Sequence, residues 1–137
     1  MFSIPALILA AALTLQPAGT SVVEITFDVG VEEGVVMAAL FDSEDAWDGG
    51  GAAVRGVRVD VAGGERVARF EGLPPGDYAL RAFHDVNGDG EMNANPFGMP
   101  TEPFGFSTNA VGNMGPASWS RARFAVPGET RQTITLR

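Results

Sequence analysis

The sequence predicts an all-β protein, a single antiparallel seven-stranded β-sandwich with one long ordered loop. Three observations predict this fold. From residue 21 onward apolar residues recur with a period of two, turn signals follow at intervals of about ten residues, and no stretch of about ten residues has a helical period. The composition agrees, because 18 glycines and 9 prolines with only 19% charged residues are typical of a turn-rich β protein.

The predicted strands follow from this alternation. In the first strand residues 23, 25, 27 and 29 are apolar and those between them are polar, while the second is a continuous apolar run suited to a central strand. An acidic, glycine-rich connection over 42–51, which contains Trp47, is expected to be a solvated turn. The seven strands are expected at 23–29, 35–41, 57–61, 66–70, 78–83, 122–126 and 134–136.

Residues 1–18 are set apart from the sandwich. The segment carries no charged side chain, and its apolar run over 6–13 is too short to span a bilayer but fits the core of a secretory signal peptide. A buried N-terminal helix is the alternative. We expect export and cleavage after Ala18, which gives a mature domain over 19–137 in an extracytoplasmic location, periplasmic or secreted, with no membrane insertion after signal removal.

Charge and composition exclude several classes of function. The chain has 17 acidic and 9 basic residues, a formal net charge of -8, and all nine cations are arginine. Because phosphate contacts need clustered cations, nucleic acids and anionic membranes are excluded as partners. The absence of cysteine excludes disulfides and thiolate zinc sites, and the single histidine, His84, excludes a histidine metal cluster.

The stretch between Asp85 and Ser120 has no predicted strand. Structureless loops of this length inside a domain are uncommon and are usually functional or disordered. Its apolar side chains argue against disorder, and we expect either a small loop core or a recognition face that could stack against sugars. The aromatic candidates for both roles are Phe97, Phe104, Phe106 and Trp119.

A cation site is predicted where this loop begins. Oxygen donors stand at positions one, three, five and nine of the segment that starts at Asp85, and Gly90 at position six permits the sharp turn of a calcium loop. Position twelve is Pro96 instead of a bidentate glutamate, and a strand leads in, so an EF-hand is excluded. The predicted ligands are Asp85, Asn87, Asp89, the Glu91 carbonyl and Asn93.

Calcium in a structural role is the expected cofactor, with weak to moderate affinity. Asn95, Glu102 or a residue of the 42–48 loop is expected to complete the shell. The alternative is a metal-free turn in which Asp85, Asn87 and Asp89 cap backbone amides. His84 shares the phase of Tyr78, Leu80 and Ala82, so we interpret it as a packing or hydrogen-bonding residue.

A resemblance adds to this interpretation. The segment from Phe70 to Leu80, FEGLPPGDYAL, resembles the strand entry of transthyretin-like and collagen-adhesin B-type sandwich domains, some of which bind structural calcium. The run that continues through 84–93, 95–100, 102–107 and 115–116 resembles a bacterial family known as domain of unknown function 2141. The resemblance covers about residues 22–137 and implies an exported single domain without an established activity.

We therefore expect an exported, non-enzymatic, monomeric β-sandwich with a structural calcium loop, which presents the loop over 94–118 to an unknown protein or glycan ligand. The alternatives are an envelope hydrolase that uses loop carboxylates and a purely structural envelope protein. A concave pocket with converging acids would favour the hydrolase.

Overall fold

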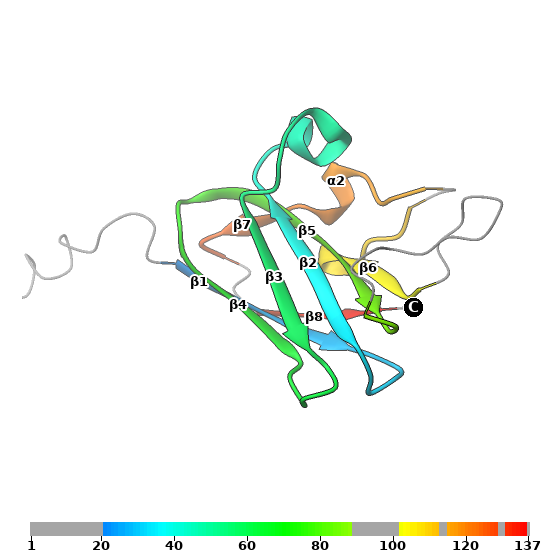
Figure 1. The fold of residues 1–137 in the computed structure, drawn as a ribbon. Coiled ribbons are helices and arrows are strands. Elements are labelled where there is room, and N and C mark those ends of the chain that lie inside the picture. Colours follow the sequence, from blue (N-terminus) through cyan, green and yellow to red (C-terminus); the bar gives the residue numbers. More distant parts are fainter. Residues whose placement is uncertain (1–20, 89–101, 113–114, 129–130, 137) are drawn as a thin grey trace, which may run out of the picture.

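The computed structural model describes residues 21–88, 102–112, 115–128 and 131–136. Within these ranges the chain forms eight strands and three short helical turns (Figure 1). The helical turns are η1 (Ala46–Gly50), η2 (Ser107–Asn109) and α2 (Trp119–Ala122). The strands are β1 (Ser21–Asp28), β2 (Val35–Phe41), β3 (Arg55–Asp60), β4 (Val67–Leu73), β5 (Gly76–Asp85), β6 (Phe104–Phe106), β7 (Phe124–Val126) and β8 (Arg131–Thr135).

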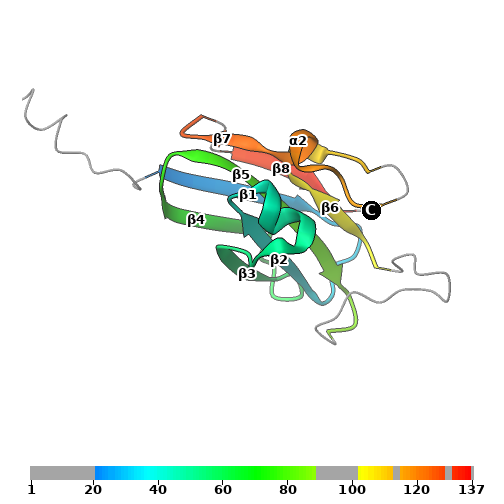
Figure 2. The ribbon, with the colours of Figure 1, turned by 90° about the horizontal axis from the view of Figure 1, so that it is seen from above.

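The strands form two sheets, so the protein is all-β and sandwich-like (Figure 2). One sheet has the order β4-β1-β8, and the other runs β3-β2-β5-β6, with β7 paired to the first residues of β5. Strand β5 is the longest and pairs with three other strands, which makes it the centre of the larger sheet. No helix among the described residues is long and apolar enough to cross a membrane.

The main core lies between the two sheets and is built by the predicted alternation. Val23, Ile25 and Phe27 of β1 are at most 1% exposed, and Leu80 and Ala82 of β5 belong to the same cluster. Each fully buried aliphatic or aromatic side chain contributes about 1.5–3 kcal/mol relative to an exposed one. The two sheets are therefore held mainly by apolar contact between their inner faces.

A second apolar cluster covers the outer face of the larger sheet. Phe41, Ala79 and Phe106 supply the sheet side of this cluster, while η1 adds Trp47 and α2 adds Ala122. Figure 1 shows both helical turns over the same end of this sheet. The outer face of one sheet is thus apolar and covered, which alternation within single strands did not predict.

Two details of the predicted sandwich need correction. The structure has eight strands in its described ranges instead of seven, because β6 pairs with β5 inside the stretch where no strand was expected. The sandwich is not wholly antiparallel, because β8 pairs in parallel with β1. Strand β6 has three residues and is too short to show alternation. The direction of β8 relative to β1 depends on the connection through β7, which no local pattern encodes.

The connection over 42–51 also differs from the expected solvated turn. Its acidic side chains Asp42, Glu44, Asp45 and Asp48 are exposed, but Trp47 is only 4% exposed. The Trp47 indole N–H donates a hydrogen bond to the carbonyl of Ala117 at 2.9 Å. The turn therefore places an aromatic side chain under the end of the long loop.

Candidate functional site

The predicted cation loop begins at the end of β5, where Asp85 is almost completely buried. Asp85 pairs with Val35 at the start of β2 and is 1% exposed. The preceding residue of the β2 turn, Gly34, has φ +71°, and a Cβ there would lie 2.2 Å from the Asp85 carbonyl oxygen and 2.8 Å from the Val86 Cα. The loop therefore starts in direct backbone contact with the turn before β2, and only glycine leaves room for it.

Glu102 returns the chain to the same place. The main-chain N–H of His84 donates to the Pro103 carbonyl at 2.7 Å, and the Val86 N–H donates to Glu102 Oε2 at 2.9 Å. Extending the register of β5 and β6 by two residues sets Glu102 opposite Asp85, on the same face. Glu102 is 8% exposed, so this site brings two buried carboxylates to one end of the sheet.

The chemistry of the donors fits a hard cation. Asp85, Asn87 and Glu102 all offer oxygen, which calcium prefers, and the sequence has no lysine or arginine from residue 82 to residue 120. Each of these three residues makes a further interaction with its surroundings. The predicted ligands Asp89, Glu91 and Asn93 lie outside the described residues. In the described ranges no three histidine, aspartate or glutamate residues are grouped to hold a metal.

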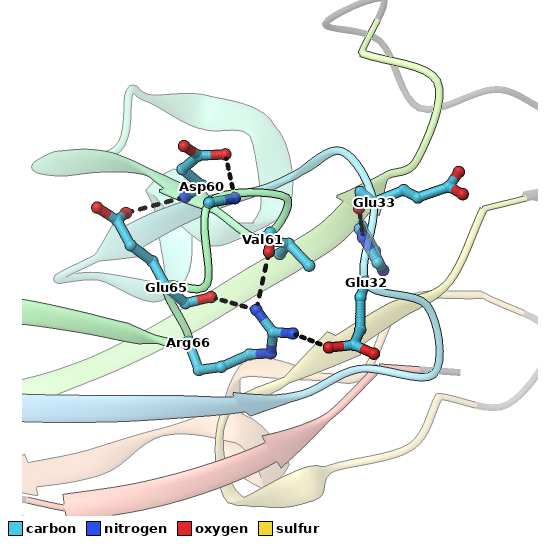
Figure 3. Close-up of polar contacts among 8 residues, drawn as sticks. Glu32, Glu33, Asp60, Val61, Glu65 and Arg66 are labelled. Carbon is cyan, nitrogen blue, oxygen red and sulfur yellow. Dashed lines mark hydrogen bonds and ion pairs between the residues drawn. The ribbon is translucent and has the colours of Figure 1, made fainter.

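The neighbouring turns at this end of the sandwich are braced by their own polar contacts. Figure 3 shows Arg66, whose guanidinium donates to the carbonyls of Val61 and Glu65 at 3.0 and 2.7 Å and lies 3.7 Å from the Glu32 carboxylate. The Glu32 side chain is 90% exposed, so this ion pair contributes little. Arg66 therefore serves mainly to close the turn between β3 and β4.

His84 links one of these turns to β5. It is fully buried, and its Nε2 lies 2.6 Å from the Glu33 carbonyl oxygen, so Nε2–H is the donor. Nδ1 is buried without a hydrogen-bond partner among the described residues. The interpretation of His84 as a packing and hydrogen-bonding residue is confirmed, and its contact joins the turn before β2 to the strand that carries Asp85.

The aromatic residues of the long loop divide between the second cluster and its margin. Phe106 is 7% exposed in the cluster, and Phe104 and Trp119 are half-buried against it. Edge-to-face ring contacts connect them, at 6.0 Å between the centroids of Trp47 and Phe106 and 6.4 Å between Trp47 and Trp119. Phe97 lies outside the described residues. Trp47 of η1 thus joins its own turn to β6 through Phe106 and to α2 through Trp119.

Arg81 is a residue of this cluster that the sequence analysis missed. Its guanidinium lies 4.6 Å from the ring centroid of Phe41 and 4.2 Å from that of Trp47, and it donates to the Trp47 carbonyl. Burial lowers the pKa of Arg81, and the charge of Asp48 opposes this effect. The signal was present, because Arg81 shares the strand phase of Ala79 and Phe83 and so faces the outer side.

Three polar residues that follow β6, Ser107, Thr108 and Asn109, were also missed. We call this group the polar clasp. Ser107 is fully buried, donates from its hydroxyl to the Ala122 carbonyl at 2.6 Å and accepts from the Leu80 N–H at 3.0 Å. Thr108 and Asn109 both have positive φ, at 58° and 53°. The Asn109 side chain donates to the Thr133 carbonyl and accepts from the Thr135 N–H, so it pairs with β8 as a short strand would. These contacts compensate for the strained backbone.

A hollow lies beside β6, between the strand and the segment that follows the clasp. It encloses about 250 Å³. The described residues that line it are Phe104, Gly105, Phe106, Asn109, Ala110, Val111, Gly112, Gly115 and Thr135. None of these described lining residues has an ionisable side chain, so they bring no acids together in the hollow.

Comparison with known protein families gives a match over most of the chain. A family model described as "Uncharacterized protein conserved in bacteria (DUF2141)" matches residues 23–135. No curated protein and no solved structure matches the chain significantly.

Proposed function

The chain belongs to this bacterial family, and we propose that it is an exported, non-enzymatic β-sandwich module that a calcium ion stabilises. We also propose that it presents the loop over 94–118 as a recognition surface for a protein or glycan. A transthyretin-like arrangement of the sandwich is part of the same proposal.

The burial of Asp85 and Glu102 is the observation that carries the calcium proposal. Like charges opposite each other destabilise a sheet, and burying a carboxylate is costly unless it is compensated. Both carboxylates interact with their surroundings, and Glu102 accepts a hydrogen bond from the Val86 N–H. A bound divalent cation would add charge compensation to these interactions, and it would hold the two ends of the loop together.

The proposed ligands are Asp85, Asn87, Asp89, the Glu91 carbonyl and Asn93. Among the candidates to complete the shell, Glu102 is favoured by the hydrogen bond that its carboxylate accepts from the Val86 N–H. Calcium in this role supplies charge compensation and cross-links the backbone. With few carboxylates the affinity belongs to the weak end of the range, about 10⁻⁴ to 10⁻³ M. Magnesium should substitute poorly, because it requires near-octahedral geometry and keeps its waters.

Isothermal titration calorimetry of the mature protein tests the site. Wild type should bind one calcium ion, and Asp85→Asn should lower the affinity by at least about tenfold, because it removes one of the few carboxylates. The 42–48 loop was one candidate to complete the shell, but it follows the end of β2 that pairs with Ala79, whereas Asp85 pairs with Val35 at the other end, so that candidate was wrong. Asp42→Asn, which changes an exposed acid in that loop, is therefore the control and should leave binding unchanged. Equal affinities for all three proteins would reject the proposed site.

The non-enzymatic part of the proposal stays a prediction. The described side chains that line the hollow beside β6 are apolar apart from Asn109 and Thr135, and none of them is an acid. A hydrolase that uses loop carboxylates is the alternative, and a purely structural envelope protein is another. Export is tested separately by mass spectrometry of protein from the native host, where the mature chain should begin at Gly19. An intact segment 1–18 in soluble cytosol would contradict export.

A further inference from the structure

The start of the cation loop carries the single Asn-Gly pair of the chain, Asn87-Gly88. Both residues are exposed, and they lie just beyond Asp85, the last residue of β5. Gly88 has φ +73°, and nothing lies within 4 Å of the position that a Cβ would take there. An asparagine in such a place reacts with the main chain of the residue after it, because a glycine without a Cβ leaves its nitrogen unhindered.

The nitrogen that would react is weakly held. The Gly88 N–H donates to the Asp85 carbonyl at 3.4 Å, which is beyond the roughly 2.7–3.2 Å of an ordinary N–H···O hydrogen bond. Asn87 also interacts with its surroundings, so the reaction needs the turn to open far enough to release it. Because both residues are exposed and follow the end of β5, this opening requires no pair of strands to separate.

Asn109, the other asparagine in the described ranges, is held much more firmly. Its side chain donates to the Thr133 carbonyl at 3.0 Å and accepts from the Thr135 N–H at 2.9 Å. The N–H of the next residue, Ala110, donates to the Ser107 carbonyl at 3.2 Å, and Ala110 carries a Cβ. A reaction at Asn109 would break these bonds, so Asn87 is the more reactive of the two.

We propose that Asn87 is a site of spontaneous deamidation, which a bound calcium ion suppresses. The Gly88 nitrogen attacks the side-chain amide carbon of Asn87, and a five-membered succinimide ring forms. The amide group leaves as ammonia, which takes up the proton of the Gly88 nitrogen. Water then opens the ring at either of its two carbonyls. One opening gives aspartate at position 87, and the other gives isoaspartate, in which the main chain runs through the side-chain carbons.

The two products have opposite effects on the cation site. This regulation concerns the calcium site proposed above and rests on that proposal. Aspartate at position 87 keeps an oxygen donor and adds a carboxylate, so it should bind calcium more tightly. Isoaspartate adds one carbon atom to the main chain, which displaces the donors that follow and should abolish binding. Calcium held by the Asn87 oxygen fixes both the side chain and the turn, so it should slow the reaction.

The test follows deamidation of the mature protein during incubation with calcium or with chelator. Trypsin releases all five asparagines in one peptide over 82–121, because no lysine or arginine occurs from residue 82 to residue 120. Tandem mass spectrometry therefore compares the sites within one molecule, and in chelator Asn87 should convert faster than Asn109. At 1 mM calcium and a Kd near 10⁻⁴ M about one-eleventh of the protein is unbound, so the rate at Asn87 should fall about tenfold.

Two variants identify the chemistry. Asn87→Gln should abolish the conversion at position 87, because glutamine would have to close a six-membered ring. Asn87→Asp is the first product made directly, and titration calorimetry should show tighter calcium binding than in wild type. In aged wild-type protein, the fraction that an isoaspartyl methyltransferase labels should have lost calcium binding.

Separate outcomes bear on the two proposals. Conversion at Asn87 in chelator that is absent, or no faster than at Asn109, would overturn the deamidation site even if calcium raises the Tm. Fast conversion that calcium does not slow, in a protein whose Tm calcium does not raise, would reject the calcium site and leave the deamidation site standing. Fast conversion that calcium does not slow despite a raised Tm would overturn the suppression by calcium.

Discussion

Gly34 is the position where the structure makes its sharpest mechanical prediction. A Cβ added there would lie 2.2 Å from the Asp85 carbonyl oxygen and 2.8 Å from both the Cα and the carbonyl oxygen of Val86, in a backbone conformation with φ +71°. Because the atoms it meets are backbone, no side chain can rotate away to make room. Gly34→Ala should therefore displace the start of the cation loop.

The expected cost has two parts. A side chain at positive φ costs about 1–2 kcal/mol, offset by about 0.4–1 kcal/mol because alanine restricts the unfolded chain. Displacing packed backbone adds about 1–3 kcal/mol. The total destabilisation of Gly34→Ala should be about 3 kcal/mol, and the same displacement should weaken calcium binding.

Two other glycines separate these parts. Gly64 has φ +98°, and nothing lies within 4 Å of the Cβ that Gly64→Ala would add. This variant should therefore be destabilised by about 1 kcal/mol, from the backbone conformation alone. Gly30→Ala has neither problem and should stay within about 0.5 kcal/mol of wild type. Urea unfolding of the three variants measures the differences. If Gly34→Ala and Gly64→Ala are equally destabilised, the backbone contact between the β2 turn and the loop is not a constraint.

Three further predictions concern the second cluster and the core. Phe106→Ala should lower the free energy of unfolding by about 3–4 kcal/mol, because the ring is only 7% exposed. Phe104 is half-buried, so Phe104→Ala should cost about half as much. Equal melting temperatures for wild type and Phe106→Ala would contradict a loop core. Arg81→Lys should lower the free energy of unfolding by about 1–2 kcal/mol and shift the tryptophan fluorescence to the red. The reason is that lysine cannot keep both ring contacts and the hydrogen bond to the Trp47 carbonyl. Arg58→Lys, at an exposed site, is the control. Burial, followed by the nearby Asp42 charge, raises the pKa of Tyr78 above 10.0, so stability should be retained below pH 10 and fall as pH rises through the higher folded pKa. The chain has one tyrosine and no lysine or cysteine, so the absorbance titration of the phenol reports this group alone; an unchanged alkaline stability profile in Tyr78→Phe would contradict the assignment.

Local sequence patterns predicted what single strands determine. Alternation placed the first five strands close to their observed positions. It also identified Val23, Ile25 and Phe27 as inward-facing, because the side chains of a half-buried strand must alternate. The phase of β5 likewise predicted the burial of His84. These features depend only on which face of the strand a side chain occupies. A side chain that faces the core is buried whichever residue it packs against.

Features that depend on distant partners escaped prediction. Strand β6 has only three residues, and its pairing becomes evident only when β5 lies beside it. Trp47 stands among acids in the sequence but is buried in the second cluster, where the carbonyl of Ala117, 70 residues later, accepts the hydrogen bond of its indole N–H. Glu102 was one of several candidates for the cation loop, and the register between β5 and β6 is what sets it opposite Asp85.

Thermal unfolding of the mature protein with calcium and with chelator tests the central claim most directly. The unfolded chain cannot assemble the ligands, so 1 mM calcium at a Kd near 10⁻⁴ M should stabilise the fold by about 1.4 kcal/mol and raise the Tm by about 5 °C. Asp89→Ala should abolish this rise while leaving a folded sandwich, and magnesium at equal concentration should produce little of it. If calcium and chelator give the same Tm and the same protease sensitivity over residues 86–118, the metal-free turn is the correct account and the calcium site is contradicted.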